Sequence, residues 1–113
     1  MADWKTVREL ALAFPGVEEG TSYGQPALRV GKRLFTWLSP NEAGALCVRV
    51  DPEEKDLLLE SNPDAYFTTP HYATYPILLV RFEHIGVAEL GQRIEDAWLL
   101  RAPKRLVDGL AAD

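Results

Sequence analysis

Three predicted strands of the sequence repeat one short pattern, in which an arginine stands between two apolar residues. The pattern occurs at residues 28–30, 48–50 and 80–82. Because side chains in a β-strand point alternately to opposite faces, the apolar residues of each segment share one face, and Arg29, Arg49 and Arg81 share the other. An apolar sheet face has to be covered. The pattern therefore predicts helices on one face of a sheet and arginines on its open face.

Helix and turn signals around these strands complete a single α+β domain over residues 1–113. Asp3 can cap a first helix. A second helix is predicted with Asp51 at its N-cap, Pro52 at its first position and Glu54 at the capping-box position. Two helical segments follow the last strand. Short connections favour an antiparallel sheet covered on one face by helices, in the order α-β(3–4)-α-β-β-α-α.

A β-hairpin is predicted over residues 26–40. Gly31 and Lys32 form its two-residue loop, and glycine in the first position favours a type II′ turn. This loop places Leu28 opposite Phe35. By alternation, the core face carries Leu28, Val30, Phe35 and Trp37, and the other face carries Arg29, Leu34, Thr36 and Leu38.

Charge is unevenly distributed along the chain. The formal net charge is -5, from 12 Lys and Arg against 17 Asp and Glu. Residues 51–64 hold six acids and one base, so this segment alone accounts for the net charge. The balance argues against general attraction to nucleic acid, for which a basic surface is expected. A local basic face remains compatible with it.

Three groups of basic residues are candidates for binding an anion. The sheet arginines suit phosphate or carboxylate recognition, and the alternative is a solvated face with cross-strand ion pairs. Basic residues at the break between the last two helices suit a nucleic-acid backbone or simply stabilise a helix end. Those at the hairpin tip suit a DNA-binding wing or an ordinary exposed turn. The candidates are Arg29, Lys32, Arg33, Arg49, Arg81, Arg101, Lys104 and Arg105.

The loop before the last strand is a candidate ligand site. His71, Tyr72 and Tyr75 supply an imidazole and two aromatic rings between Pro70 and Pro76. Aromatic rings can stack on a base, and histidine can transfer a proton near neutral pH. The alternative is a rigid loop whose tyrosines pack over the core.

Few residues suggest catalysis. The chain has two histidines and one cysteine, and neither metal-ligand spacing nor a glycine-rich phosphate loop occurs. Cys47 lies in the middle of a predicted strand, where a small buried residue is usual. We therefore expect no enzyme activity, no cofactor and no metal. The absence of a signal segment predicts a cytoplasmic protein, and the absence of a long apolar run predicts no membrane contact. We expect a monomer.

Three stretches in order point to a known family. They are "FPGVEEGTSYGQPALRVGKRLFTWL", "PEEKDLLLESNPDAYFTTPHY" and "ELGQRIEDAWLLRAPKRL". Together they resemble the MmcQ/YjbR family over roughly residues 7–107. The resemblance implies a frataxin-like (CyaY-like) α+β fold and a DNA-binding "double wing" arrangement of hairpins. It implies no catalytic residues.

Two positions depart from the family pattern. Many members have a Lys-x-x-Trp step where this chain has residues 73–76, and Ser-Tyr where it has Ala97 and Trp98. Pro103 and Lys104 of the C-terminal pattern remain. Any role attached to the missing lysine is therefore not transferred.

The leading interpretation is a small non-enzymatic domain that binds DNA through the basic hairpin tip and the arginine-bearing face. A second interpretation is a module that binds a small anionic ligand or a protein with the open face and the 71–75 loop. A third is an enzyme that uses His71.

Overall fold

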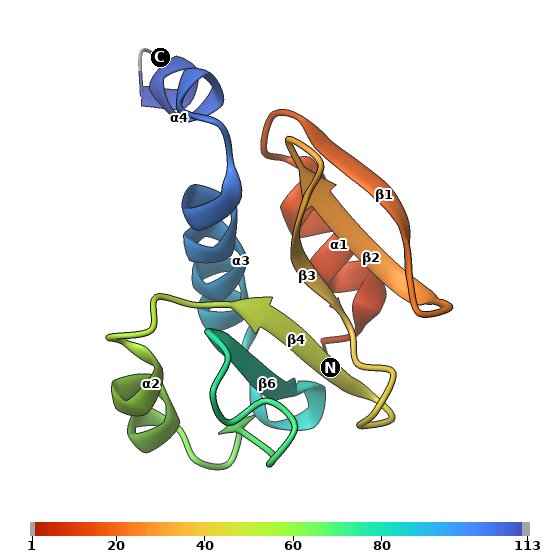
Figure 1. The fold of residues 1–113 in the computed structure, drawn as a ribbon, viewed down its shortest axis with the longest axis vertical. Coiled ribbons are helices and arrows are strands. Elements are labelled where there is room, and N and C mark those ends of the chain that lie inside the picture. Colours follow the sequence, from red (N-terminus) through yellow and green to blue (C-terminus); the bar gives the residue numbers. More distant parts are fainter. Residues whose placement is uncertain (1, 112–113) are drawn as a thin grey trace.

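Six antiparallel strands form one sheet in the computed structural model, which describes residues 2–111 (Figure 1). The strands are β1 (Val17–Ser22), β2 (Gln25–Val30), β3 (Arg33–Leu38), β4 (Ala45–Arg49), β5 (Tyr66–Phe67) and β6 (Ile77–Arg81). Their order across the sheet is β1-β2-β3-β4-β6-β5. The predicted antiparallel α+β fold is confirmed, with four strands between the first two helices.

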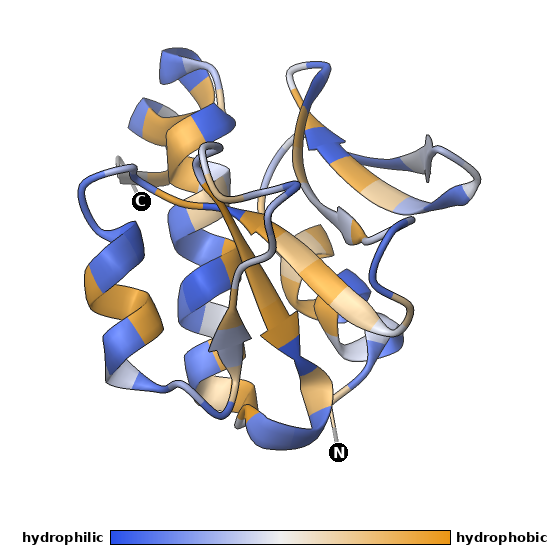
Figure 2. Ribbon diagram, turned by 60° about the horizontal axis from the view of Figure 1, so that its bottom comes forward, coloured by the Kyte–Doolittle hydropathy of each residue, from blue (hydrophilic) through white to orange (hydrophobic). Residues whose placement is uncertain are grey.

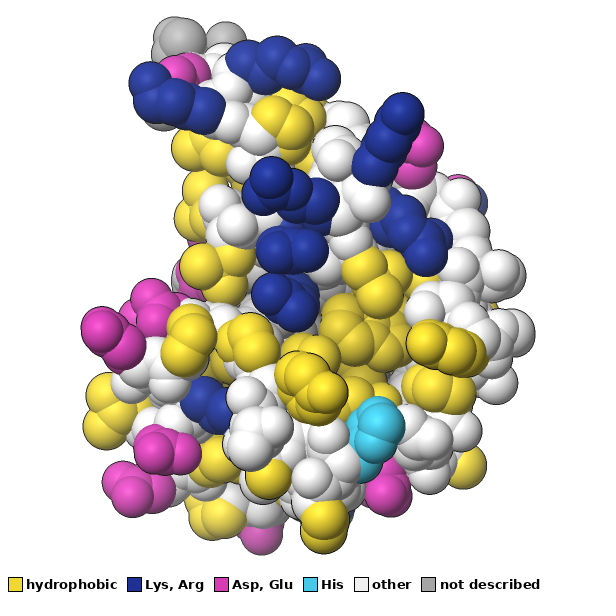
Figure 3. Space-filling model, in the orientation of Figure 1, with side chains coloured by type: hydrophobic (Ala, Val, Ile, Leu, Met, Phe, Trp, Pro, Cys, Tyr) yellow, Lys and Arg dark blue, Asp and Glu magenta, His cyan; other side chains and the backbone are white. Residues whose placement is uncertain are grey.

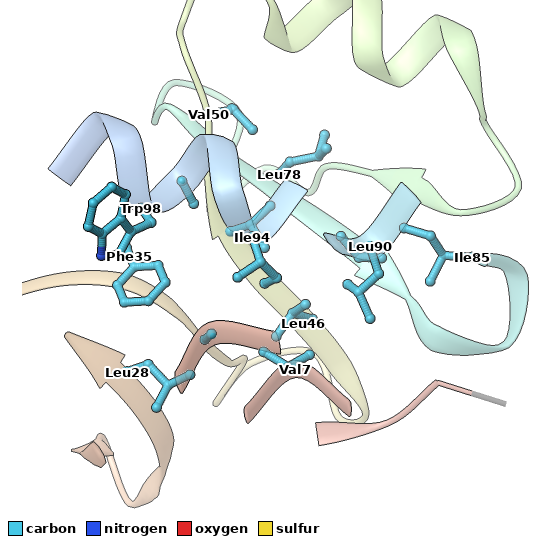
Figure 4. Close-up of a cluster of buried hydrophobic side chains, with 14 of the residues drawn as sticks. Val7, Leu28, Phe35, Leu46, Val50, Leu78, Ile85, Leu90, Ile94 and Trp98 are labelled. Carbon is cyan, nitrogen blue, oxygen red and sulfur yellow. The ribbon is translucent and has the colours of Figure 1, made fainter. Parts of the chain in front are cut away.

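The helices cover one face of this sheet. They are α1 (Trp4–Leu12), α2 (Lys55–Ser61), α3 (Val87–Arg101) and α4 (Lys104–Ala111), with a 3-10 turn η1 (Phe82–His84) after β6. All four contribute apolar side chains to one main core. Figure 4 shows how Val7 of α1 and Ile94 of α3 point toward Leu46 of β4 in this core. The residues of the main core include the apolar flanks of all three arginine segments.

The opposite face of the sheet, the open face, carries a second apolar cluster. Its buried members are Ala27, Trp37, Ala45, Cys47, Tyr72, Ile77 and Leu79. Strands β4 and β6 are therefore buried on both faces, and Figure 2 shows them hydrophobic along most of their length. The loop of residues 68–76 supplies Tyr72 to this cluster and so covers part of the face.

A β-bulge in β3 changes the predicted hairpin register. Thr36 pairs with Leu28 where the prediction placed Phe35, so Phe35 is the extra residue of the strand. Phe35 packs in the main core, whereas Trp37 lies in the cluster on the open face. The prediction that Trp37 faces the core is therefore wrong. Thr36 and Leu38 lie on the helix-covered face instead of the open face, because the bulge shifts the alternation by one residue.

The two predicted helix caps have different outcomes. The Asp3 side chain accepts a 3.0 Å hydrogen bond from the amide of Thr6 and caps α1 as predicted. The second helix begins later than predicted, at Lys55, and its N-cap Glu54 makes no side-chain cap hydrogen bond. The Asp51 side chain accepts a 2.9 Å hydrogen bond from the amide of Glu53, and its carbonyl accepts from the amide of Glu54 (2.9 Å), so Asp51 caps a turn before the helix. The predicted capping box of the second helix is therefore wrong.

No helix formed by residues 2–111 combines the length and the apolar character needed to cross a membrane.

Candidate anion-binding face

The tip of the β2–β3 hairpin packs directly on the junction between α3 and α4. A Cβ atom added to Gly31 would lie 2.7 Å from Cγ of Pro103, so only glycine allows this approach. Gly31 and Lys32 have φ angles of 57° and 67°. Two left-handed residues make a type I′ turn, and the predicted type II′ turn is wrong. The contact brings two of the predicted basic groups, at the hairpin tip and at the α3–α4 break, to one place.

Arg49 joins this place from the end of β4. Burial lowers the pKa of Arg49, and the nearby positive charge of Arg101 lowers it further. Arg49 and the end of α3 therefore lie close together. We call the assembled side chains the basic cluster; its members are Lys32, Arg33, Arg49, Arg101, Lys104 and Arg105.

The basic cluster holds few acidic side chains. Lys104 lies 3.4 Å from Asp108 in an exposed ion pair, the one salt bridge that the structure describes for the cluster. The Nε atom of Arg101 is buried and has no hydrogen-bond partner within residues 2–111. Figure 3 shows Lys and Arg side chains gathered over α4, the end of α3 and the hairpin, with most Asp and Glu side chains of this view around α2. The negative net charge is thus segregated from the basic cluster.

The three sheet arginines share the open face but do not form one site. Arg81 pairs in register with Ala45, and Arg49 pairs with Ile77, so the two arginines lie at opposite ends of β4 and β6. Four residues of strand separate them by about 13 Å. The Arg81 guanidinium lies 4.0 Å from the centroid of the Phe67 ring, at the far side of the sheet. An anion held by all three arginines is therefore not supported by this arrangement.

Arg29 lies on β2, and strand β3 separates it from Arg49 on β4. Its Nη1 donates a 3.1 Å hydrogen bond to the carbonyl of Thr21 on β1, and its residue pairs with Leu34 of β3. The side chain is half-buried. The Arg29 guanidinium therefore lies toward the β1–β2 turn and keeps further donors for a ligand.

A hollow of about 350 Å³ lies on the open face. We call it the aromatic hollow; its lining residues are Ser22, Tyr23, Leu34, Trp37, Pro40, Asn41, His71 and Tyr72. His71 meets Tyr72 edge-on, with ring centroids 4.6 Å apart. Tyr75 does not line the hollow and is half-exposed beside it. Two of the three predicted loop residues are thus brought to one concave surface.

Lys55 holds the loop of residues 68–76 in place, and this role was not predicted. The side chain is buried, and its Nζ donates to the carbonyls of Tyr72 (2.8 Å), Ala73 (3.3 Å) and Tyr75 (2.8 Å). Burial lowers the pKa of this ammonium group. Three carbonyls at the end of a turn match the three N–H donors of one lysine. The signal in the sequence was the single base within the acidic segment 51–64.

Cys47 lies under the same loop and is expected to be unreactive. Burial raises the pKa of its thiol to about 11, although the nearby hydroxyls of Tyr72 and Ser39 oppose this increase. We expect iodoacetamide in mildly alkaline buffer to leave the native protein unmodified and to alkylate it after denaturation in urea. Mass spectrometry of the intact protein measures the adduct. Rapid alkylation of the native protein would contradict the burial.

The groups available for chemistry are few in the described part of the chain. His71 is exposed and makes no side-chain hydrogen bond to any residue between 2 and 111, so its ring contact with Tyr72 orients it instead. Within the same range, no group of three or more His, Cys, Asp or Glu side chains is arranged to hold a metal ion. The features that stand out are the basic cluster and the aromatic hollow.

Comparison with known proteins agrees with this fold. A model of the YjbR family matches residues 12–100. The uncharacterized proteins Rv2570 of Mycobacterium tuberculosis and Mb2600 of Mycobacterium bovis are each 35% identical over 130 aligned positions, which cover 100% of this chain and 98% of theirs. The crystal structure of Deinococcus radiodurans protein DR2400, with the family domain DUF419, superposes with a TM-score of 0.78 at 18% identity, covering 98% of this chain and 89% of that one. The sequence relatives and the family match agree, and the chain belongs to the YjbR family.

Proposed function

We propose that this protein is a non-catalytic nucleic-acid-binding domain that holds a phosphate backbone on the basic cluster. One observation carries the proposal: the fold brings basic residues from three separate segments of the chain to the surroundings of the α3–α4 junction. Their assembly depends on the contact between Gly31 and Pro103. Localised positive charge of this kind is the feature by which proteins bind phosphate backbones.

The electrostatics of the cluster support an anionic partner. Like charges that lie together destabilise the folded protein. Burial is the main cause of the lowered pKa of Arg49, and repulsion by Arg101 lowers this pKa further. A phosphate group would relieve the repulsion and accept the donors of a guanidinium in a bidentate geometry. The buried Nε of Arg101 is one donor that has no protein partner within the described residues.

The overall negative charge does not oppose this proposal. The acids of residues 51–64 belong to α2 and its flanking turns, and Lys55 is buried there. Exposed charges farther apart than about 8 Å are largely screened at physiological ionic strength. A strand on the basic cluster therefore interacts mainly with the cluster itself.

Removing two charges from the cluster tests the proposal. We expect the double variant Arg101→Gln, Lys104→Gln to bind labelled DNA about tenfold more weakly at low salt. On duplex DNA, its slope of log affinity against log salt should be smaller by about 2, since each lost phosphate contact removes about 0.9. Fluorescence anisotropy titrations at several salt concentrations measure both quantities.

A matched control separates the cluster from total charge. Lys5→Gln with Arg8→Gln removes the same two charges from α1, where both side chains are exposed and outside the basic cluster. This control should retain affinity and salt slope within about twofold, because neither residue belongs to the basic cluster. Loss of the exposed Arg8–Glu19 ion pair should change the free energy of unfolding little. Absence of binding to both duplex and single-stranded DNA at low salt would refute the proposal.

A further inference from the structure

Tyr23 has a backbone conformation and an exposure that folding alone does not explain. It lies in the turn between β1 and β2 with φ 50°, followed by Gly24 with φ 78°. Left-handed backbone is rare for a bulky residue, and turns of this type strongly prefer asparagine and glycine. The Tyr23 residue is 90% exposed, so little packing offsets the backbone cost. Such an outlier is a reason to look for a ligand.

Tyr23 lines the aromatic hollow together with three other aromatic residues. Trp37 comes from β3, and His71 and Tyr72 come from the loop of residues 68–76. Aromatic walls with about 350 Å³ between them fit a flat ring, since ligand sites start at about 300 Å³. The hollow thus has the shape and the chemistry to stack a planar heterocycle.

Hydrogen bonds fix the wall formed by the loop. The Tyr72 hydroxyl lies 3.3 Å from the Ser39 hydroxyl and 3.4 Å from Nδ2 of Asn41. Lys55 holds the backbone of the same loop through three carbonyls. A wall held at both its backbone and its side chain is ordered before any ligand binds, which lowers the entropic cost of binding.

The aromatic hollow and the basic cluster are parts of one surface. Leu34 lines the hollow and pairs in register with Arg29, whose guanidinium donates to the carbonyl of Thr21, directly before Ser22 of the hollow lining. Figure 3 shows Lys and Arg side chains bordering a hydrophobic depression on this side of the molecule, with a histidine on its other rim. A ligand can therefore place an anionic group on the cluster and a ring in the hollow at the same time.

We propose that the aromatic hollow holds one unstacked base of a single-stranded nucleic acid whose phosphates lie on the basic cluster. The inference rests on the proposed nucleic-acid binding and names the form of nucleic acid that is preferred. Bases inside a duplex expose only their edges, whereas every base of a single strand has a free face that can stack on an aromatic ring. A basic cluster without the aromatic hollow would bind phosphates with the same affinity whether or not the strand carried bases.

Strands with and without bases test this inference. The wild-type protein is titrated with labelled oligothymidylate of about ten nucleotides, and with an abasic strand that has the same number of phosphates. We expect oligothymidylate to bind about tenfold more tightly. An oligouridylate of equal length is measured beside them, and a preference over the abasic strand in either sugar series supports the inference.

Tyr23→Asn locates the preference in the hollow. Asparagine adopts left-handed backbone readily, so this variant should fold with equal or greater stability while its preference for bases falls to about twofold or less. Tyr75→Asn is the matched control, because this half-exposed tyrosine lies outside the hollow and its variant should keep the full preference. Thermal denaturation of both variants confirms that they are folded.

The outcomes distinguish the two proposals. Equal affinity for abasic and base-bearing strands, with salt dependence intact, overturns the base site and leaves the basic cluster as a phosphate site. An unchanged preference in Tyr23→Asn also overturns the hollow as the place where the base binds. Failure of every strand to bind at low salt overturns both the proposed function and this inference.

Discussion

Replacing Trp98 with alanine is expected to lower the free energy of unfolding by about 4 kcal/mol. The indole is fully buried in the main core and stacks on Phe14, with ring centroids 5.3 Å apart. Its Nε1–H donates a 3.1 Å hydrogen bond to the carbonyl of Pro15. The variant loses this burial, leaves a cavity and removes the donor. Because domains are typically stable by about 5–15 kcal/mol, much of the protein's stability would be lost.

Urea denaturation followed by circular dichroism measures this change. Two further variants serve as comparisons. Trp98→Phe keeps an aromatic ring but removes the N–H group, so we expect a smaller loss of about 1–2 kcal/mol. Leu99→Ala alters the neighbouring, exposed side chain and should cost less than about 1 kcal/mol. A loss of stability in Trp98→Ala no larger than that in Leu99→Ala would contradict the packing described for α3.

Replacing Lys55 with methionine is expected to lower the free energy of unfolding by about 3 kcal/mol. Methionine has a similar length but no donor, so the carbonyls of Tyr72, Ala73 and Tyr75 lose the partner that they share. The turn that they close should then open more often. Hydrogen exchange of the Ile77 amide, which donates to the carbonyl of Tyr75, reports this opening as faster exchange.

Lys5→Met is the matched control for this prediction. It exchanges the same residue types at an exposed position of α1, where we expect a change within about 0.5 kcal/mol. Hydrogen exchange around the 68–76 loop should also be unchanged. Equal stability of the Lys55 and Lys5 variants would show that solvent replaces the lysine at these carbonyls. This result would refute the role of Lys55 in holding the loop of residues 68–76.

The strands and their faces could be predicted because alternation is a local property. The apolar flanks of Arg29, Arg49 and Arg81 pack in the main core as the pattern indicates. The position of Trp37 could not be predicted in the same way. A bulge at Phe35 adds one residue to β3. Nothing about a phenylalanine between Leu34 and Thr36 marks a bulge in the sequence. Alternation counted through that position is off by one.

The candidate site could be predicted as a set of residues but not as an arrangement. The three basic groups are recognisable in the sequence, but their distances are set by long-range contacts. Gly31 meets Pro103 across most of the chain length, and a two-residue turn gives no sign of that partner. Register separates Arg81 from Arg49 for a similar reason, since β4 and β6 run in opposite directions. The second apolar cluster on the open face was missed because Cys47, Ile77 and Leu79 belong to strands buried on both faces.

The separation of charge between α2 and the basic cluster gives the molecule an electric dipole moment. In the field of a polyanion, such a dipole experiences a torque that turns the cluster toward the strand and α2 away from it. Rotation of this kind acts during diffusion, before any contact forms, and raises the fraction of collisions that are productive. For a strand bound as proposed, the acidic segment would add to the rate of encounter at low ionic strength by repelling the wrong orientation, so that a protein of net charge -5 approaches the strand with its basic side first.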